Sequence, residues 1–164
     1  MARKLYFWIY FSIVFIVIRF VPTYLPLITN HQQAGLVFDF TAKPFYLLMV
    51  SILNLLFDYV SLIMPVMELL SIQIFLLVRK PSLRSQFKGY VPIILHYFVP
   101  YVLVKAFVLS TERSMSVLVW IGISIVTWVI LLVFLINQRY SYAKVATIIL
   151  TTLIFSRILA TIMF

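Results

Sequence analysis

The stretch PFYLLMVSILNLLFDYVSLIMPVMELLSIQIFLLV, residues 44–78, decides the fold, because it is apolar almost throughout. A transmembrane helix needs about 20 apolar residues. The stretch is too long for one straight span and too short for two spans with a turn. It predicts one long, tilted helix over 45–78, kinked at Pro65, with the residues before about 55 near or beyond the outer interface. A re-entrant half-helix followed by a short span is the alternative.

The composition of the whole chain indicates an integral membrane protein. Of its 164 residues, 65% are hydrophobic and 10% are charged, and the mean hydropathy is +1.15. A water-soluble domain of this size needs more polar surface. Cysteine is absent, which excludes disulfides, thiolate metal sites and cysteine nucleophiles. We expect one membrane domain over 1–164, without cofactors, and a bacterial plasma membrane as its location.

Four further apolar runs complete an all-α, polytopic bundle of five transmembrane spans. The first run begins like a signal peptide, but no cleavage site of small residues follows it, so we expect it to be retained. Short polar turns separate most of the runs, and the longest connection covers residues 23–43. The four expected spans besides the long helix are about 5–22, 90–109, 117–136 and 145–163.

The basic residues predict the orientation. Formal net charge is +9, which in a membrane protein reflects basic loops that fix topology and touch anionic lipid head groups, not nucleic-acid binding. Only Lys43 and Arg113 fall on one side of the five-span arrangement. We therefore expect a cytoplasmic N-terminus and a C-terminus on the opposite side. The basic residues on the expected cytoplasmic side are Arg3, Lys4, Arg79, Lys80, Arg84, Lys88, Arg139 and Lys144.

Five charged residues fall inside the expected spans and form a candidate intramembrane charge cluster. A charge at the centre of a bilayer costs on the order of 3 kcal/mol on insertion scales, so such residues normally face the bundle and have a partner. Helical rise places the three basic residues roughly 20 Å from the cytoplasmic surface, Glu68 about 15 Å and Asp58 about 30 Å. We therefore expect Glu68 to pair with Arg157, Arg19 or Lys105, with Arg157 favoured, and Asp58 to reach the same basic layer from its other side. The five residues are Glu68, Arg157, Arg19, Lys105 and Asp58.

These intramembrane charges fit three interpretations. In the first interpretation, Arg19 and Lys105, which lie near span ends, extend to lipid phosphates without a partner in the protein. A structural ion pair between helices is the second interpretation, and a substrate or proton site is the third. Asn54 and His96 are candidate groove-lining residues, although such side chains more often form hydrogen bonds between helices. A lone histidine in a span is more often a packing residue than a metal ligand, so no metal site is expected.

The order of parts resembles the Yip family of small five-span membrane proteins. A basic loop that contains proline leads into a third span with spaced prolines, RKPSLRSQFKGYVPIILHYFVPYVL, and YSYAKVATIILTTLIFSRILATI forms the fifth span. The resemblance implies a scaffold or trafficking-type membrane protein with no catalytic residues. The long N-terminal cytoplasmic region of the eukaryotic members is missing, which puts Rab-type partner binding in doubt.

Three functions follow from these observations. The first is a non-enzymatic scaffold, accessory or partner-binding membrane protein, since H-E-x-x-H, G-x-S-x-G and P-loop motifs are absent from the sequence. Its partner is an unknown membrane protein or a second copy of the chain. The second is a small transporter or channel subunit, indicated by the intramembrane charges. The third is an immunity-type protein that blocks a membrane toxin. Only the small size of the chain supports this function.

Overall fold

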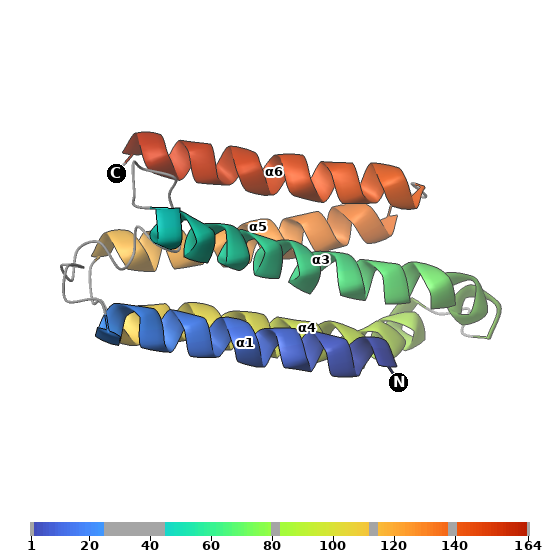
Figure 1. Ribbon diagram of the computed structural model, residues 1–164. Helices are drawn as coiled ribbons and strands as arrows, with labels where there is room; N and C mark the ends of the chain where they lie inside the picture. Colours follow the sequence, from blue (N-terminus) through green and yellow to red (C-terminus); the bar gives the residue numbers. More distant parts are fainter. Residues whose placement is uncertain (1, 25–44, 80–82, 112–114, 138–140, 164) are drawn as a thin grey trace.

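The computed structural model describes residues 2–24, 45–79, 83–111, 115–137 and 141–163, and the expected 23–43 connection lies almost wholly outside them. Every described residue except Ser141 is helical, which confirms the all-α prediction. The helices run side by side as a bundle (Figure 1). They are α1 Ala2–Tyr24, α3 Phe45–Arg79, α4 Leu83–Thr111, α5 Met115–Asn137 and α6 Tyr142–Met163.

Four of these helices are long and apolar enough to cross a membrane. Runs of this length satisfy their own backbone hydrogen bonds, which is the condition for lying in hydrocarbon. The fifth helix, α1, has 23 residues and lies alongside the others (Figure 1). The apolar segments of the four are Leu48–Ile72, Lys88–Phe107, Leu118–Ile136 and Tyr142–Leu159.

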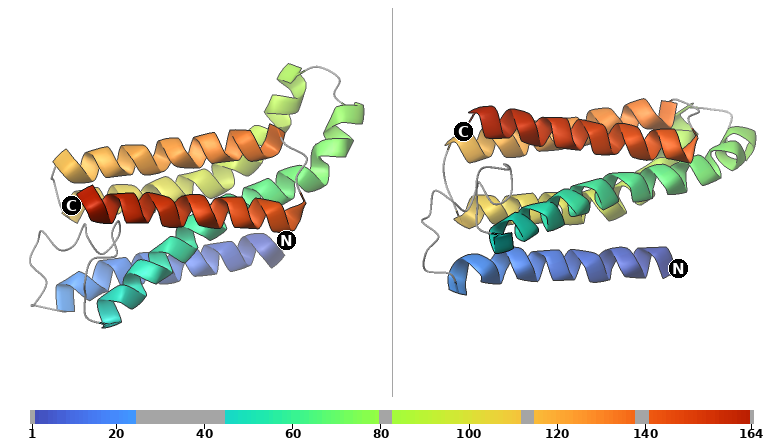
Figure 2. Two further views of the ribbon diagram at one scale, coloured as in Figure 1. Left: turned by 90° about the horizontal axis from the view of Figure 1, so that it is seen from above. Right: turned by 45° about the horizontal axis from the view of Figure 1, so that its top comes forward.

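Helix α3 is the centre of the bundle and packs against all four other helices. In its apolar segment 56% of the residues are buried, compared with 22–28% in the segments of α4, α5 and α6. Figure 2 shows α3 crossing obliquely between α1 on one side and the α5–α6 pair on the other. Residues that hold the bundle together must therefore meet α3.

The long helix is continuous through Pro65, as the sequence predicts, and its axis bends along its length (Figure 2). Proline lacks a backbone N–H and displaces the preceding turn, which explains a bend without a break. The last turns of α3, rather than its first, extend beyond the other helices (Figure 1).

The basic stretch 79–89 is the second difference from the sequence prediction. The sequence predicts a loop there, but α4 begins at Leu83, and its first turns project together with the end of α3 (Figure 2). The residues of this stretch are mostly good helix formers apart from Pro81 and Gly89, and a polar helix is stable where it leaves the hydrocarbon. The α3–α4 hairpin therefore extends beyond the other helices of the bundle (Figure 2).

Aromatic side chains fill the core between the helices. Phe7 of α1 lies against Phe57 of α3 and Tyr97 of α4, with ring centroids 6.2 and 4.8 Å apart. Trp128 of α5 stacks on Tyr101 of α4 at 5.9 Å. All five side chains are at most 2% exposed. Aromatic pairs at these separations add specific packing energy to the burial of their area.

The chain ends lie at opposite ends of the bundle (Figure 1). An odd number of antiparallel passes requires this arrangement. The end that holds the N-terminus is called the N-terminal end below, and the end that holds the C-terminus is called the C-terminal end.

Candidate functional site

A stripe of buried polar residues runs along the face of α3 that points into the bundle. Ser51, Asn54 and Ser61 are fully buried, and Asp58 is 4% exposed. These positions recur every three or four residues, which places them on one helix face. The stripe is the polar part of the otherwise apolar helix, and Asp58 is its charged member.

Asp58 binds a cation with each of its carboxylate oxygens. Lys105 Nζ of α4 lies 2.6 Å from Oδ1, and Arg157 Nη2 of α6 lies 2.6 Å from Oδ2. The Lys105 side chain is fully buried, and the side chains of Asp58 and Arg157 are 5% exposed. Charge-assisted hydrogen bonds of this length are the strong class. This buried triad therefore ties α3, α4 and α6 together at one level of the bundle.

Aromatic side chains surround the buried triad. Lys105 Nζ lies 5.3 Å from the ring centroid of Tyr101, which is the geometry of a cation–π contact. The Trp128 indole donates a hydrogen bond of 3.2 Å to Ser61 Oγ, and Ser61 in turn donates to the Asp58 carbonyl at 2.8 Å. The triad and its aromatic surroundings thus also connect α5 to the other three helices.

A small cavity adjoins the triad between α5 and α6. Its volume is about 20 Å³, and Asp58 and Arg157 form part of its wall. A cavity needs about 10–15 Å³ to hold one water molecule, so this one admits a single small occupant. Hydroxyl-bearing residues of α5 and α6 line the rest of it, together with apolar and aromatic residues: Tyr101, Trp120, Ile123, Ser124, Thr127, Leu153 and Ser156.

Glu68 lies apart from this triad, and its expected pairing with Arg157 is wrong. The Tyr97 hydroxyl donates a hydrogen bond of 2.8 Å to Glu68 Oε1, and Lys4 Nζ lies 3.9 Å from Oε2. The Glu68 side chain is 20% exposed and that of Lys4 46%. The depth estimate failed because it was counted from the projecting end of α3.

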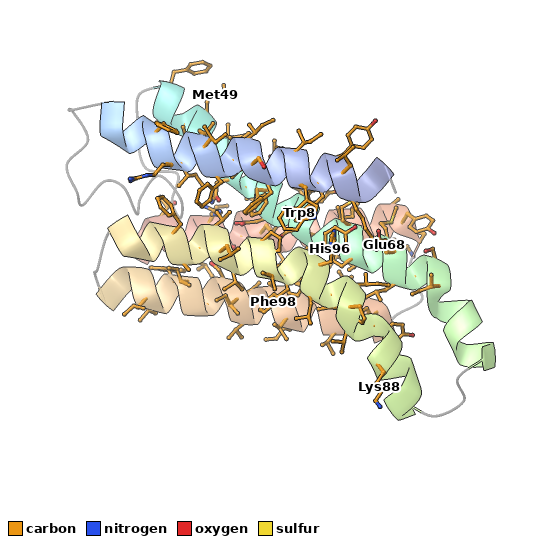
Figure 3. The ribbon with its side chains drawn as sticks, turned by 90° about the horizontal axis from the view of Figure 1, so that it is seen from below. Trp8, Met49, Glu68, Lys88, His96 and Phe98 are labelled. Carbon is orange, nitrogen blue, oxygen red and sulfur yellow. The ribbon has the colours of Figure 1, made fainter. Side chains whose placement is uncertain are left out.

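The other three candidate residues occupy separate places. The Arg19 guanidinium lies 5.6 Å from the ring centroid of Phe107, so it contacts α4 near the C-terminal end. Asn54 is fully buried in the polar stripe of α3. His96 Nε2 accepts a hydrogen bond of 3.1 Å from the Trp8 indole of α1, which requires the neutral ring with its proton on Nδ1. Figure 3 shows Trp8 and His96 beside Glu68, where α1, α3 and α4 meet.

Two important residues could not be singled out from sequence. Tyr97 binds Glu68 and Tyr101 contacts Lys105, but they are two of ten tyrosines. The available signal was spacing, because Tyr97, Tyr101 and Lys105 recur every four residues on one face of α4. Among the residues that the structure describes, no group of three or more His, Asp or Glu side chains is arranged to hold a metal ion.

The fold and the triad define a class: a polytopic helical bundle with the composition of a membrane protein and an ion-paired centre. Comparison with known proteins finds no matching protein-family model, curated protein or solved structure.

Proposed function

We propose that this chain is a non-enzymatic integral membrane protein with a scaffold, accessory or partner-binding role of the Yip type. The observation that supports this proposal is that the buried charges pair with one another. Asp58 pairs with both Lys105 and Arg157 across three helices, so the charged groups hold the bundle together. Aromatic side chains fill the surrounding space, as expected for a rigid body that presents its outer faces to lipid or to another protein.

We further propose a plasma-membrane location, with the N-terminus in the cytoplasm and the C-terminus on the other side. The asymmetry of Lys and Arg supports this orientation. Because the chain has no cysteine, single cysteines can be introduced without background. With a membrane-impermeant maleimide and intact cells, a cysteine at Phe164 should react, and one at Ser85 should react only after lysis. Equal labelling of both would contradict the orientation.

The partner is a membrane protein or a second copy of this chain, and anionic head groups bind the cytoplasmic basic residues. The test is purification from the native membrane in mild detergent, followed by identification of stoichiometric components. A matched variant, Asp58→Leu/Lys105→Met/Arg157→Met, removes the charges while keeping similar volumes. A scaffold should keep its complex in this variant, because its outer faces are unchanged. A folded variant that loses the complex would contradict the proposal.

A small transporter or channel subunit is the second candidate, favoured by the cavity beside Asp58 and Arg157. Flux assays on purified protein in vesicles separate the two functions. The scaffold predicts proton and ion fluxes equal to those of empty vesicles. A flux that disappears in the same triple variant would support transport and overturn the first proposal.

A further inference from the structure

The cavity between α5 and α6 has an unusual lining for the interior of an apolar bundle. Ser124 and Thr127 of α5 are three residues apart and share one helix face, and Arg157 of α6 lies across from them. All three side chains carry hydrogen-bond donors. The acidic residue of the lining, Asp58, is bound by Lys105 and Arg157 through both of its oxygens. The lining is therefore rich in donors.

The hydroxyl groups of α5 differ from those of α6. On α6, Thr147, Thr152 and Ser156 each donate to a carbonyl of their own helix, at 2.8–2.9 Å. This bond is the usual way to satisfy a hydroxyl inside an apolar helix. Within the described part of the chain, neither Ser124 Oγ nor Thr127 Oγ1 makes a hydrogen bond to another residue. Both hydroxyls line the cavity, so an occupant there can satisfy them.

Charge favours a negative occupant. When ionised, Asp58, Lys105 and Arg157 together carry a net charge of +1. A net charge in an apolar surrounding is costly, and one monovalent anion beside Arg157 would reduce the charge of the site to zero. The guanidinium has five N–H donors in a fixed fork, and Arg157 lines the cavity while its Nη2 binds Asp58.

Size restricts the anion to one atom. The cavity of about 20 Å³ is slightly larger than one water molecule needs. It has no room for the further oxygens of a sulfate or a phosphate. The cavity lies near the surface of the bundle, since Ile123 at its rim is 42% exposed and Ser124, Thr127 and Ser156 are only half-buried.

We propose that the cavity between α5 and α6 is a binding site for a halide-type monovalent anion, held by Arg157 and the hydroxyls of Ser124 and Thr127. The site is independent of the scaffold function, because it concerns an ion inside the bundle and not a partner on its outer face. Its effect is to complete the charge balance of the buried triad and to hold α5 against α6.

The test is thermal unfolding of the purified protein in a zwitterionic detergent, at constant ionic strength, with chloride, bromide, gluconate or sulfate as the anion. A bound ion stabilises the folded state in proportion to the logarithm of its concentration. Chloride and bromide should raise Tm with the logarithm of their concentration, by about 3 °C when the halide exceeds its dissociation constant tenfold. Gluconate and sulfate should not, because they do not fit.

Two variants make the assignment specific. Ser124→Ala/Thr127→Val removes the two hydroxyls, keeps the triad, and should abolish the halide-dependent rise in Tm. Thr147→Val/Thr151→Val is the matched control on the exposed face of α6, where both hydroxyls bond to their own helix, and it should keep the rise. Trp120 lines the cavity, so bromide should also quench tryptophan fluorescence saturably, and Trp120→Phe should remove that saturable part.

Either of two results would contradict the proposed anion site. Equal Tm values in chloride and gluconate would mean that the cavity holds water. An unchanged halide effect in Ser124→Ala/Thr127→Val would place the ion elsewhere, for example at the basic surface residues.

Discussion

Asp58 and Glu68 lie ten residues apart on the same helix, yet they are held in opposite ways. Asp58 is 4% exposed and binds two cations at 2.6 Å. Glu68 accepts one hydrogen bond from Tyr97 and has a half-exposed lysine 3.9 Å away. The difference follows from burial, because the Asp58 side chain is 5% exposed and the Glu68 side chain is 20% exposed. Deep charges require ionic partners, whereas shallow ones can use water and neutral donors.

The largest effect is expected from neutralising the deep acid. Asp58→Asn keeps the shape of the side chain but leaves Lys105 and Arg157 as two buried cations. Breaking a buried pair in this way costs about 3–5 kcal/mol. The free energy of unfolding, measured by steric trapping in bicelles, should fall by this amount. A loss no larger than that of Glu68→Gln would show that the two acids are equivalent, and it would contradict the difference between them described above.

Replacing all three residues of the triad together should lower the free energy of unfolding much less than the sum of the losses in the three single variants. In Asp58→Leu/Lys105→Met/Arg157→Met no charge is left without a partner, and apolar side chains of similar volume fill the centre. We expect the triple variant to be more stable than additivity predicts by at least about 2 kcal/mol. Unfolding measurements on the three single variants and the triple variant give this coupling. Additive losses would mean that the three side chains act independently.

The sequence predicted the fold more fully than the site. Apolar runs of span length and the prolines between them are local features, so the helices and the continuous α3 through Pro65 follow from them. The membrane depth of a residue cannot be predicted from the neighbouring sequence, because it depends on which end of a long helix leaves the hydrocarbon. The sequence 79–89 contains helix formers next to Pro81 and Gly89, and its composition alone does not show where α4 begins.

Residue types predicted which charged residues form the site better than they predicted which of these residues pair. Asp58, Lys105 and Arg157 were all candidates, because a charge in an apolar run needs a partner wherever it lies. The choice between Asp58 and Glu68 as that partner depended on an estimated depth, and the tilt and projection of α3 made the estimate wrong. Ser124 and Thr127 carried no signal, since hydroxyl residues are common in membrane helices and usually bond to their own backbone.

A smaller effect is expected from neutralising the shallow acid. Glu68→Gln keeps an oxygen that can accept the hydrogen bond from Tyr97, and only the weak attraction to Lys4 is lost. Unfolding free energy should fall by about 1 kcal/mol or less. Tyr97→Phe is the informative companion, because it removes the donor from a 20% exposed carboxylate. A loss above about 3 kcal/mol in Glu68→Gln would indicate a buried ionic role that the 3.9 Å contact does not provide.

The smallest effect is expected at Lys4, and its comparison with Lys105 is the sharpest test of depth. Each lysine faces one acid of α3, but the Lys4 side chain is 46% exposed and that of Lys105 is fully buried. Exposed ion pairs contribute about 0–1 kcal/mol, because water solvates either partner when the other is removed. Lys4→Gln should therefore change the unfolding free energy by less than about 0.5 kcal/mol, and added salt should reduce even this difference. Lys105→Gln leaves Asp58 with Arg157 alone, and its loss should exceed that of Lys4→Gln severalfold and respond little to salt. Similar losses for the two lysines, with similar salt dependence, would mean that water reaches the centre of the bundle.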